Sequence, residues 1–146
     1  MLKTKLLHPE ILAALGAAGH SGRVLVADGN YPFCTRANPA APRVYLNLAP
    51  GLLKVTDVLK VLAESIPVEA AHVMQPADGS EPPIWAEFRE ILPEEVKLQA
   101  LGRFEFYDVA DATETALVVA TGEQRIYANI LLTIGVVAPG DQDATG

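Results

Sequence analysis

Apolar positions along the chain follow two spacings, one typical of amphipathic helices and one typical of buried strands. Helical spacing predicts helices over 9–19, 55–66, 85–92 and 104–112. Short apolar or β-branched runs predict strands over 23–27, 43–47, 69–74, 96–101, 116–120 and 129–137. Because helices and strands interleave along the whole length, we expect a three-layer α/β/α domain. Its helices would cover both faces of a central, mostly parallel or mixed sheet of about six strands.

The chain has 146 residues, which suits one domain with a proper core. We expect this domain to occupy residues 1–137. The last nine residues, 138–146, are polar and glycine-rich, so they are expected to form a flexible tail. No internal repeat divides the sequence.

Composition narrows the possible partners. The net charge is −7, and an acidic surface repels nucleic acid and anionic lipid, so neither is an expected partner. No apolar run has the length of a signal peptide or a membrane span, and we expect a cytoplasmic protein. Cys34 is the only cysteine and the three histidines lack paired ligand spacing, so we expect neither an internal disulfide nor a metal.

His20 and Asp28 flank the first predicted strand and form one candidate pair. His20 follows a helix end, where the dipole favours imidazolium. Asp28 begins the loop after the strand, and in open α/β sheets such loops line the usual ligand crevice. A carboxylate there can fix the tautomer of a histidine and support its charge. The alternative is a histidine that caps a helix and an aspartate that starts a turn.

Tyr127 and Asn129 form a second candidate pair. Two residues apart on a strand, they point the same way and offer a phenol and an amide side by side, which suits sugar hydroxyls. The alternative is an edge strand with ordinary polar residues. Arg103 is either a polar anchor or a surface charge, whereas the aromatic Phe104 that follows it is expected in the core. Trp85 either stacks on the apolar face of a sugar ring or packs in the core.

Taken in order, several segments resemble the family of D-ribose pyranases and L-fucose mutarotases, over roughly residues 1–137. The matching segments are Met1–Lys3, Pro9–Leu12, Gly19–His20, Val24–Asp28, Pro83–Trp85, Arg103–Tyr107, Val118–Glu123, Tyr127–Leu132 and Gly135–Val136. The ribose branch usually carries a second histidine near position 104, where this chain has Phe104, so the fucose branch is favoured. His8 departs from the short polar residue that the family often has before its first helix, which is expected to weaken the helix cap.

This resemblance implies a three-layer subunit in a ring-built homo-oligomer, typically a decamer, with sites at subunit interfaces. It also implies that residues matching His20, Asp28, Tyr127 and Asn129 surround the sugar, each site being completed by a neighbouring subunit. The implied partner is a free monosaccharide, most favourably L-fucose, and no cofactor is required.

Mutarotation needs two proton transfers near neutral pH, one from the anomeric hydroxyl and one to the ring oxygen, which favours histidine chemistry. We assign His20 as the principal acid/base group and Asp28 as its orienting partner. Tyr127 is the second proton donor or a hydroxyl anchor, while Asn129 and Arg103 hold sugar hydroxyls.

Three alternatives stay open at this point. The first is a D-ribose pyranase. The second is a non-catalytic monosaccharide-binding protein, which would keep Asn129 and Trp85 but not need His20. The third is a structural oligomer-former that would need none of these residues. If the protein is an L-fucose mutarotase, we expect Trp85 to supply the apolar wall against the sugar's methyl group.

Overall fold

The computed structural model describes residues 1–141, which contain four helices and six strands. The helices are α1 (Pro9–Ala18), α2 (Val55–Ala63), α3 (Ile84–Ile91) and α4 (Arg103–Asp111). The strands are β1 (Arg23–Ala27), β2 (Arg43–Tyr45), β3 (Val68–Met74), β4 (Leu98–Leu101), β5 (Thr115–Ala120) and β6 (Ile130–Ile134). Every helix and strand expected from the hydrophobic pattern is present, with ends that differ by at most a few residues.

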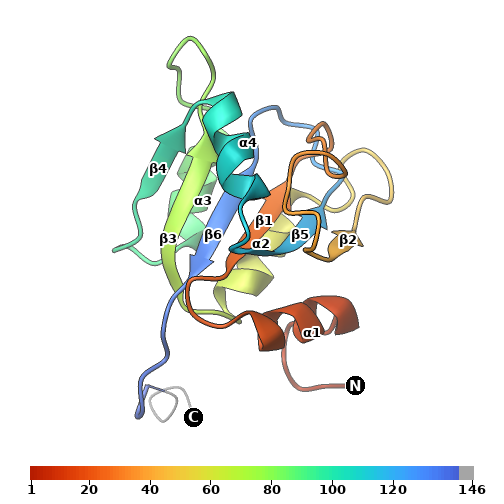
Figure 1. The fold of residues 1–146 in the computed structure, drawn as a ribbon, viewed down its shortest axis with the longest axis vertical. Coiled ribbons are helices and arrows are strands. Elements are labelled where there is room, and N and C mark those ends of the chain that lie inside the picture. The colour runs from red at the N-terminus through yellow and green to blue at the C-terminus, as the bar shows by residue number, and fades with distance from the viewer. Residues whose placement is uncertain (142–146) are drawn as a thin grey trace.

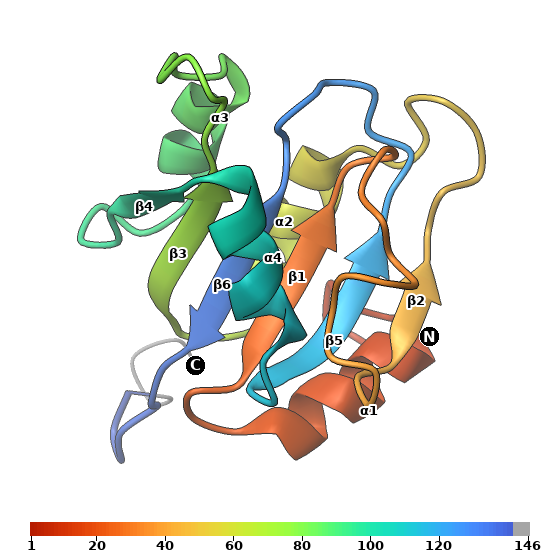
Figure 2. The same cartoon turned by 45° about the horizontal axis from the view of Figure 1, so that its top comes forward.

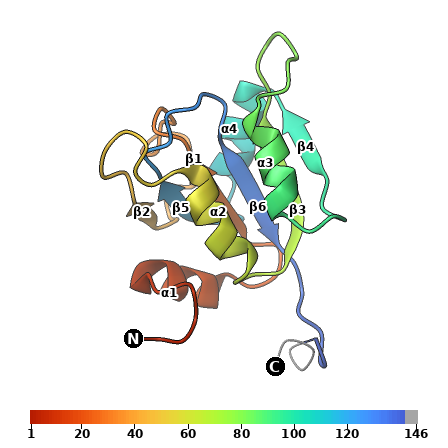
Figure 3. The same ribbon diagram turned by 180° about the vertical axis from the view of Figure 1, so that it is seen from behind.

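The strands form one mixed sheet in the order β2-β5-β1-β6-β3-β4. β6 runs antiparallel to both of its neighbours, β1 and β3, whereas the other three pairings are parallel. Helix α4 covers one face of the sheet, and α2 and α3 cover the other (Figures 1 and 3). The expected three-layer α/β architecture with a mixed sheet is therefore confirmed.

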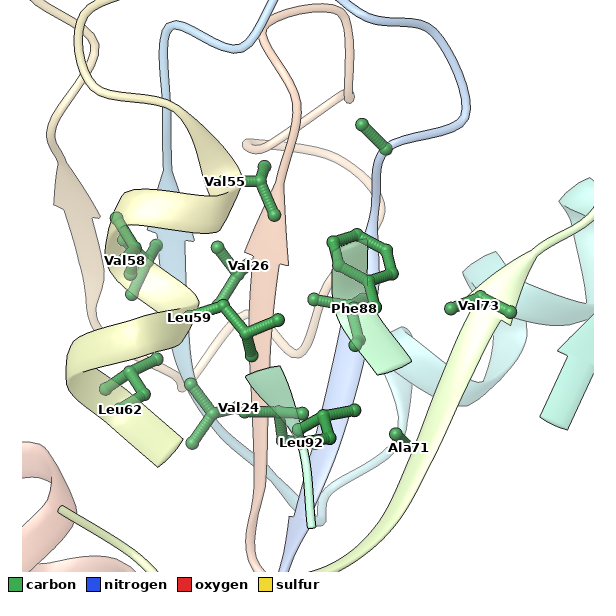
Figure 4. Packing of buried hydrophobic residues seen from close by; sticks show 14 of the residues in the cluster. Val24, Val26, Val55, Val58, Leu59, Leu62, Ala71, Val73, Phe88 and Leu92 are labelled. Atoms are coloured by element: carbon green, nitrogen blue, oxygen red, sulfur yellow. The ribbon is translucent and has the colours of Figure 1, made fainter. Parts of the chain in front are cut away.

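Alternation along β1 assigns its side chains to two separate cores, because successive strand residues point to opposite faces. Val24 and Val26 belong to the cluster under α2 and α3, where Leu59 and Phe88 are fully buried (Figure 4). Leu25 belongs to the second cluster, on the α4 face. Burial on both faces explains why this strand is a continuous apolar run in the sequence.

Helix α1 lies across the end of the sheet at which β1 and β5 begin (Figure 2). Pro9 occupies its first turn, and the His8 Nδ1 atom accepts a hydrogen bond from the Ile11 backbone N–H at 3.4 Å. The imidazole of His8 therefore serves as the cap of this helix. That this cap is weaker than one made by a short polar residue stays a prediction. Among residues 1–141, no helix combines the length and the apolar character needed to cross a membrane.

One expected feature near the C-terminus differs from the structure. β6 begins at Ile130 and ends at Ile134, so it is shorter than the predicted 129–137. Tyr127, three residues before this strand, has a φ of 55°, a left-handed conformation that a strand does not contain. Of the predicted tail, residues 138–141 form a turn, in which the Asp141 N–H donates to the Ala138 carbonyl. Residues 142–146 lie outside the described part of the chain.

Candidate functional site

Several loops meet at one edge of the sheet. β1, β3, β4 and β5 end at this edge, and antiparallel β6 begins there (Figure 2). Ligands of open α/β sheets bind in the crevice outside the carboxyl ends of the strands. Asp28 follows β1, Arg103 begins α4 after β4, and Asn129 immediately precedes β6.

A cavity of about 190 Å³ lies at this edge, and we call it the Asp28 cleft. It is lined by Asp28, Asn30, Tyr31, Met74, Arg103, Tyr107, Ile126, Tyr127 and Asn129. Its volume is below the roughly 300–1,000 Å³ of pockets that bury drug-sized ligands, so it suits a smaller molecule. Carboxylate, guanidinium, phenol and amide groups from three segments of the chain converge on it.

Asp28 is the buried carboxylate of the cleft, with 2% of its surface exposed. Its oxygens accept hydrogen bonds from the backbone N–H groups of Asn30 at 3.0 Å and Ala128 at 3.2 Å. Burial raises the pKa of Asp28, and the negative charge of Glu123 adds to this, although the backbone hydrogen bonds oppose it. A carboxyl group with a raised pKa is suited to exchange protons nearer to neutral pH.

Asn129 and Tyr127 reach the cleft by a route that the sequence did not predict. Both precede β6, so the strand geometry proposed to align them is wrong. The Asn129 Oδ1 atom instead accepts the Asp28 backbone N–H at 2.8 Å, which ties the two segments together. Tyr127 lines the same cleft from a left-handed turn. The two side chains are neighbours because of the loop, not because of strand alternation.

The α4 end of the cleft carries Arg103, whose guanidinium carbon lies 4.6 Å from the centroid of the Phe104 ring. Phe104 is 63% exposed, so the expectation that it belongs to the core is wrong. Tyr107 is half-buried and lines the cleft while it packs against the second core. The start of α4 thus presents both a cation and aromatic surface to the cleft edge.

His20 lies at the opposite end of β1 from Asp28. The strand between them accounts for roughly 13 Å of separation at about 3.3 Å per residue. The His20 Nε2 atom is 2.9 Å from the Glu69 Oε2 atom, and both side chains are about half exposed. His20 also borders a second, larger cavity of about 690 Å³ near the N-terminal segment. The expected pairing of His20 with Asp28 is therefore not made within one chain, because a strand's length separates them.

Trp85 is part of the core on the α2 and α3 face, where 5% of its surface is exposed. It does not line the Asp28 cleft. Sequence reasoning missed five residues that line the cleft, which are Asn30, Tyr31, Met74, Tyr107 and Ile126. Of these, Tyr31 had a signal, since it follows Asp28 by three residues in the loop after β1. Met74 and Ile126 had none, because isolated apolar residues look the same in a core and in a pocket.

An ion pair between buried Glu123 and partly exposed Arg125 supports the loop that carries Tyr127. Glu123 is 3% exposed, and Arg125 donates to its carboxylate from Nε at 3.2 Å and from Nη2 at 2.7 Å. Arg125 also pairs with Glu87 of α3. Burial alone would raise the pKa of Glu123, but Arg125 outweighs it and holds that pKa below its usual value. The pair joins the loop to the helical layer behind the sheet.

Glu123→Gln is expected to lower the free energy of unfolding by about 1–3 kcal/mol at neutral pH, because Arg125 loses the buried one of its two charged acceptors. The folded pKa is depressed, so ionised Glu123 stabilises the protein above the usual value of 4.5, and this contribution is lost as pH falls through the lowered pKa. Urea unfolding at several pH values should show a deficit that shrinks in acid. A deficit independent of pH would contradict this prediction, and Glu90→Gln on exposed α3 surface is the matched control.

Within residues 1–141, no three His, Cys, Asp or Glu side chains gather in a way that would hold a metal ion. The polar groups of the cleft are instead those that recognise and deprotonate hydroxyl groups. Carboxylate, phenol and amide groups offer both donors and acceptors, as polyhydroxylated ligands require.

Comparison with known proteins assigns the chain to a class. The model of the RbsD/FucU transport protein family matches residues 1–137. The chain is 38% identical over 144 residues to the fucose mutarotase of Homo sapiens, with 91% of each chain covered. It is 35% identical over 142 residues to the D-ribose pyranase of Variovorax paradoxus (strain S110), with 93% of this chain and 98% of that one covered.

The fold agrees with these relatives. A crystal structure of the fucose mutarotase from Streptococcus pneumoniae in complex with L-fucose matches with a TM-score of 0.79 and 27% identity, over 94% of this chain and 100% of that chain. These features define an isomerase-type enzyme of carbohydrate chemistry. The chain belongs to the RbsD/FucU family, as the sequence resemblance indicated.

Proposed function

We propose that this protein is a mutarotase for L-fucose and that its reaction takes place in the Asp28 cleft. The observation that carries the proposal is the convergence of Asp28, Arg103, Tyr127 and Asn129 on one small cavity at the carboxyl edge of the sheet. Family membership supports sugar mutarotation, and relatives are named for both fucose and ribose. The choice of fucose is our proposal.

We further propose that each site is shared between subunits of a homo-oligomer, most simply a decamer. A single chain holds His20 a strand's length away from Asp28, and in this proposal a neighbouring subunit supplies the histidine. Exposed apolar side chains give such an assembly surface to bury. They include Leu48 at 85%, Leu52 at 51% and Val136 at 65% exposure. A cytoplasmic location also stays a prediction from the sequence.

The proposed chemistry opens and closes the sugar ring. A base takes the proton of the anomeric hydroxyl, and the O–H electron pair forms the carbonyl as the bond from the anomeric carbon to the ring oxygen breaks. The ring oxygen takes a proton from an acid, the carbonyl turns, and the steps reverse on its other face. His20 of a neighbouring subunit is the principal proton carrier, and Tyr127 is the second donor.

Asp28, Asn129 and Arg103 would hold the sugar in this scheme. Asp28 has a raised pKa and can accept a hydrogen bond from a sugar hydroxyl or exchange a proton with it. Arg103 and Asn129 both line the cleft and supply donors to it. No covalent intermediate is needed, because each transfer moves only a proton and the ring-opening electron pair.

The apolar wall for the methyl group of fucose is best supplied by Met74 and Ile126, which line the cleft, while Trp85 belongs to the core. Fucose differs from galactose by a methyl in place of a hydroxymethyl group. Burying one methyl contributes about 0.8 kcal/mol. Phe104 adds an exposed aromatic surface beside Arg103.

The proposal is tested by NMR saturation exchange between the anomers of free sugars, with no added metal or nucleotide. We expect the protein to speed exchange of L-fucose without changing the equilibrium ratio of anomers. Exchange that stays at the buffer rate for every sugar in a panel would refute the proposed mutarotase activity. Faster exchange of ribose than of fucose would refute the choice of sugar and leave mutarotation intact.

Selectivity for fucose over galactose is expected to be modest, roughly tenfold, because a pocket rejects an added hydroxyl only weakly. Ile126→Asn should reduce this preference by replacing the wall with a polar group, and should change the rate with ribose less. The fucose-to-galactose ratio and the rate with ribose come from the same exchange measurements. An unchanged fucose-to-galactose ratio would show that Ile126 does not contact the methyl group. Trp85→Phe is the control for an apolar change outside the cleft.

The assembly is tested separately. Light scattering at micromolar concentration is expected to report a particle many times larger than the 15.5 kDa chain. Half of the residues are apolar and the mean hydropathy is +0.22, which leaves apolar surface to cover in so small a domain. A particle of 15.5 kDa would refute both the oligomer and the shared site.

A further inference from the structure

Two walls of the Asp28 cleft come from different segments of the chain. One is the loop after β1, which contains Tyr31, and the other is α4, which contributes Arg103 and Tyr107. The segment between β1 and β2 lies beside α4 on the same face of the sheet (Figure 2). Arg36 belongs to this segment. It stands outside the lining of the cleft and contacts both walls.

The guanidinium of Arg36 reaches the last turn of α4. Its Nε atom donates to the Asp111 Oδ2 atom at 3.0 Å, and its Nη2 atom donates to the Asp108 Oδ1 atom at 3.1 Å. The two aspartates are three positions apart, so they lie on one side of the helix. Carboxylates there face the negative end of the helix dipole, and α4 has no basic residue of its own in its last turn. Arg36 therefore supplies the cation that the end of α4 lacks.

The same guanidinium covers an aromatic ring of the cleft. Its central carbon lies 4.6 Å from the centroid of the Tyr107 ring. A cation within about 6 Å of a tyrosine ring is attracted by the π electrons of the ring. A lone ion pair at the surface contributes little. The Arg36 side chain, however, is only 31% exposed and combines two carboxylates and one ring from the same part of α4.

The facing wall is held by the backbone of Arg36. The Tyr31 hydroxyl donates to the Arg36 carbonyl at 2.6 Å. Burial raises the pKa of Tyr31, so its hydroxyl stays protonated and can make this bond. The Tyr31 and Tyr107 rings meet edge to face, with their centroids 5.5 Å apart. Arg36 is thus bonded to one of these tyrosines through its backbone and contacts the other through its guanidinium.

We propose that Arg36 is a positioning residue of the Asp28 cleft, which holds Tyr107 against Tyr31 and so fixes the Tyr107 hydroxyl where the sugar binds. A phenol can donate to a sugar hydroxyl or accept from it, but only at hydrogen-bond distance. Such a group must be held within about 0.5 Å of its working place, which requires contacts from outside the site. Arg36 acts through Tyr107 and does not itself touch the sugar. This proposal rests on the proposed function, because it places the sugar in this cleft.

The arrangement of the two rings is measured first, in the protein without sugar. NMR of protein labelled in its tyrosine rings should show nuclear Overhauser contacts between Tyr31 and Tyr107, with Tyr107→Phe to assign the signals. Arg36→Met keeps an apolar stem but removes the guanidinium, so it should weaken these contacts. The Asn38 N–H donates to the Ala110 carbonyl at 2.9 Å, which keeps the segment attached to α4 in this variant.

The matched control is Arg89→Met. It removes an arginine that pairs with Glu81 and belongs to α3, on the other face of the sheet from α4 (Figure 3). This variant should leave the contacts between the Tyr31 and Tyr107 rings unchanged, and it should exchange sugar at the unsubstituted rate. Urea unfolding of both arginine variants checks that each is folded.

The exchange of sugar anomers is measured next. Tyr107→Phe should lower kcat/KM by about 3–10-fold, as expected for the loss of one hydrogen bond. Arg36→Met should lower it by a similar factor. Arg36→Lys keeps the cation but not the forked geometry, so it should recover part of the loss. Arg36→Met added to Tyr107→Phe should cost less than about twofold more, because the hydroxyl that Arg36 positions is already absent.

The two proposals fail in different ways. Ring contacts that are equal in Arg36→Met and in the unsubstituted protein would overturn the role of Arg36, whether or not any sugar is exchanged. A double variant whose loss is the product of the two single losses would also overturn it, because Arg36 would then act independently of Tyr107. If Arg36→Met does not fold, Arg36→Lys takes its place in both measurements. An unsubstituted protein that exchanges no sugar refutes the proposed function, and the ring contacts then still decide whether Arg36 holds Tyr107.

Discussion

His20→Ala is expected to slow the exchange of fucose anomers by about 10²–10⁴-fold, the usual contribution of a positioned acid/base group. The ring is half exposed and, within residues 1–141, its one hydrogen bond is to Glu69, so its removal should leave the core intact. The loss should therefore appear in kcat while sugar binding changes little. Saturation-exchange NMR on free fucose measures the rate, and titration of the sugar measures the affinity.

Two controls separate proton transfer from structural damage. His8→Ser removes another imidazole, but serine is a good N-cap and should replace the bond to the Ile11 N–H, so the rate should persist. Added imidazole should restore part of the rate of His20→Ala, because it supplies the missing proton carrier. A loss under tenfold in a folded His20→Ala protein would show that His20 is not the carrier.

The fold was predictable because its signals are local. The strand at 23–27 is a continuous apolar run that only a sheet buried on both faces can accommodate, and its bounds were predicted correctly. The end of β6 and the turn at Tyr127 could not be predicted, because a left-handed tyrosine has no signature in the sequence. Phe104 was assigned to the core from its type alone, yet it is exposed at the edge of the cleft.

The candidate site was predictable only in part, for a reason of geometry. Asp28 lines a cleft because it follows a parallel strand, which is a rule of topology that sequence order reveals. The partner of His20 was not predictable, because Glu69 reaches it through a bulge, and a bulge depends on the register of two strands. The resemblance to a family supplied the set of residues, but not which of them lie together in one chain.

Co-assembly of the two impaired variants, His20→Ala and Asp28→Asn, is expected to restore activity, because the proposed site draws His20 and Asp28 from different subunits. Asp28→Asn should itself be strongly impaired, since an amide cannot accept both backbone hydrogen bonds that the Asp28 carboxylate accepts. Sites that combine the intact histidine of one variant with the intact carboxylate of the other remain complete. With random assembly at equal amounts, about one site in four is complete in a symmetric ring.

The experiment requires subunits that have exchanged. His20→Ala and Asp28→Asn chains are co-expressed with different affinity tags, isolated through both tags, and compared with each variant alone. Recovery to about a quarter of the original rate would follow from a site that each pair of neighbours completes. A double variant that carries both substitutions in one chain, co-assembled with the original chain, should also leave about one site in four complete. A site is then complete only where two original chains meet, because each interface between an original chain and a double variant lacks one of the two groups. Mixed assemblies no more active than either variant alone would mean that His20 and Asp28 do not meet across an interface, and the shared site would have to be abandoned.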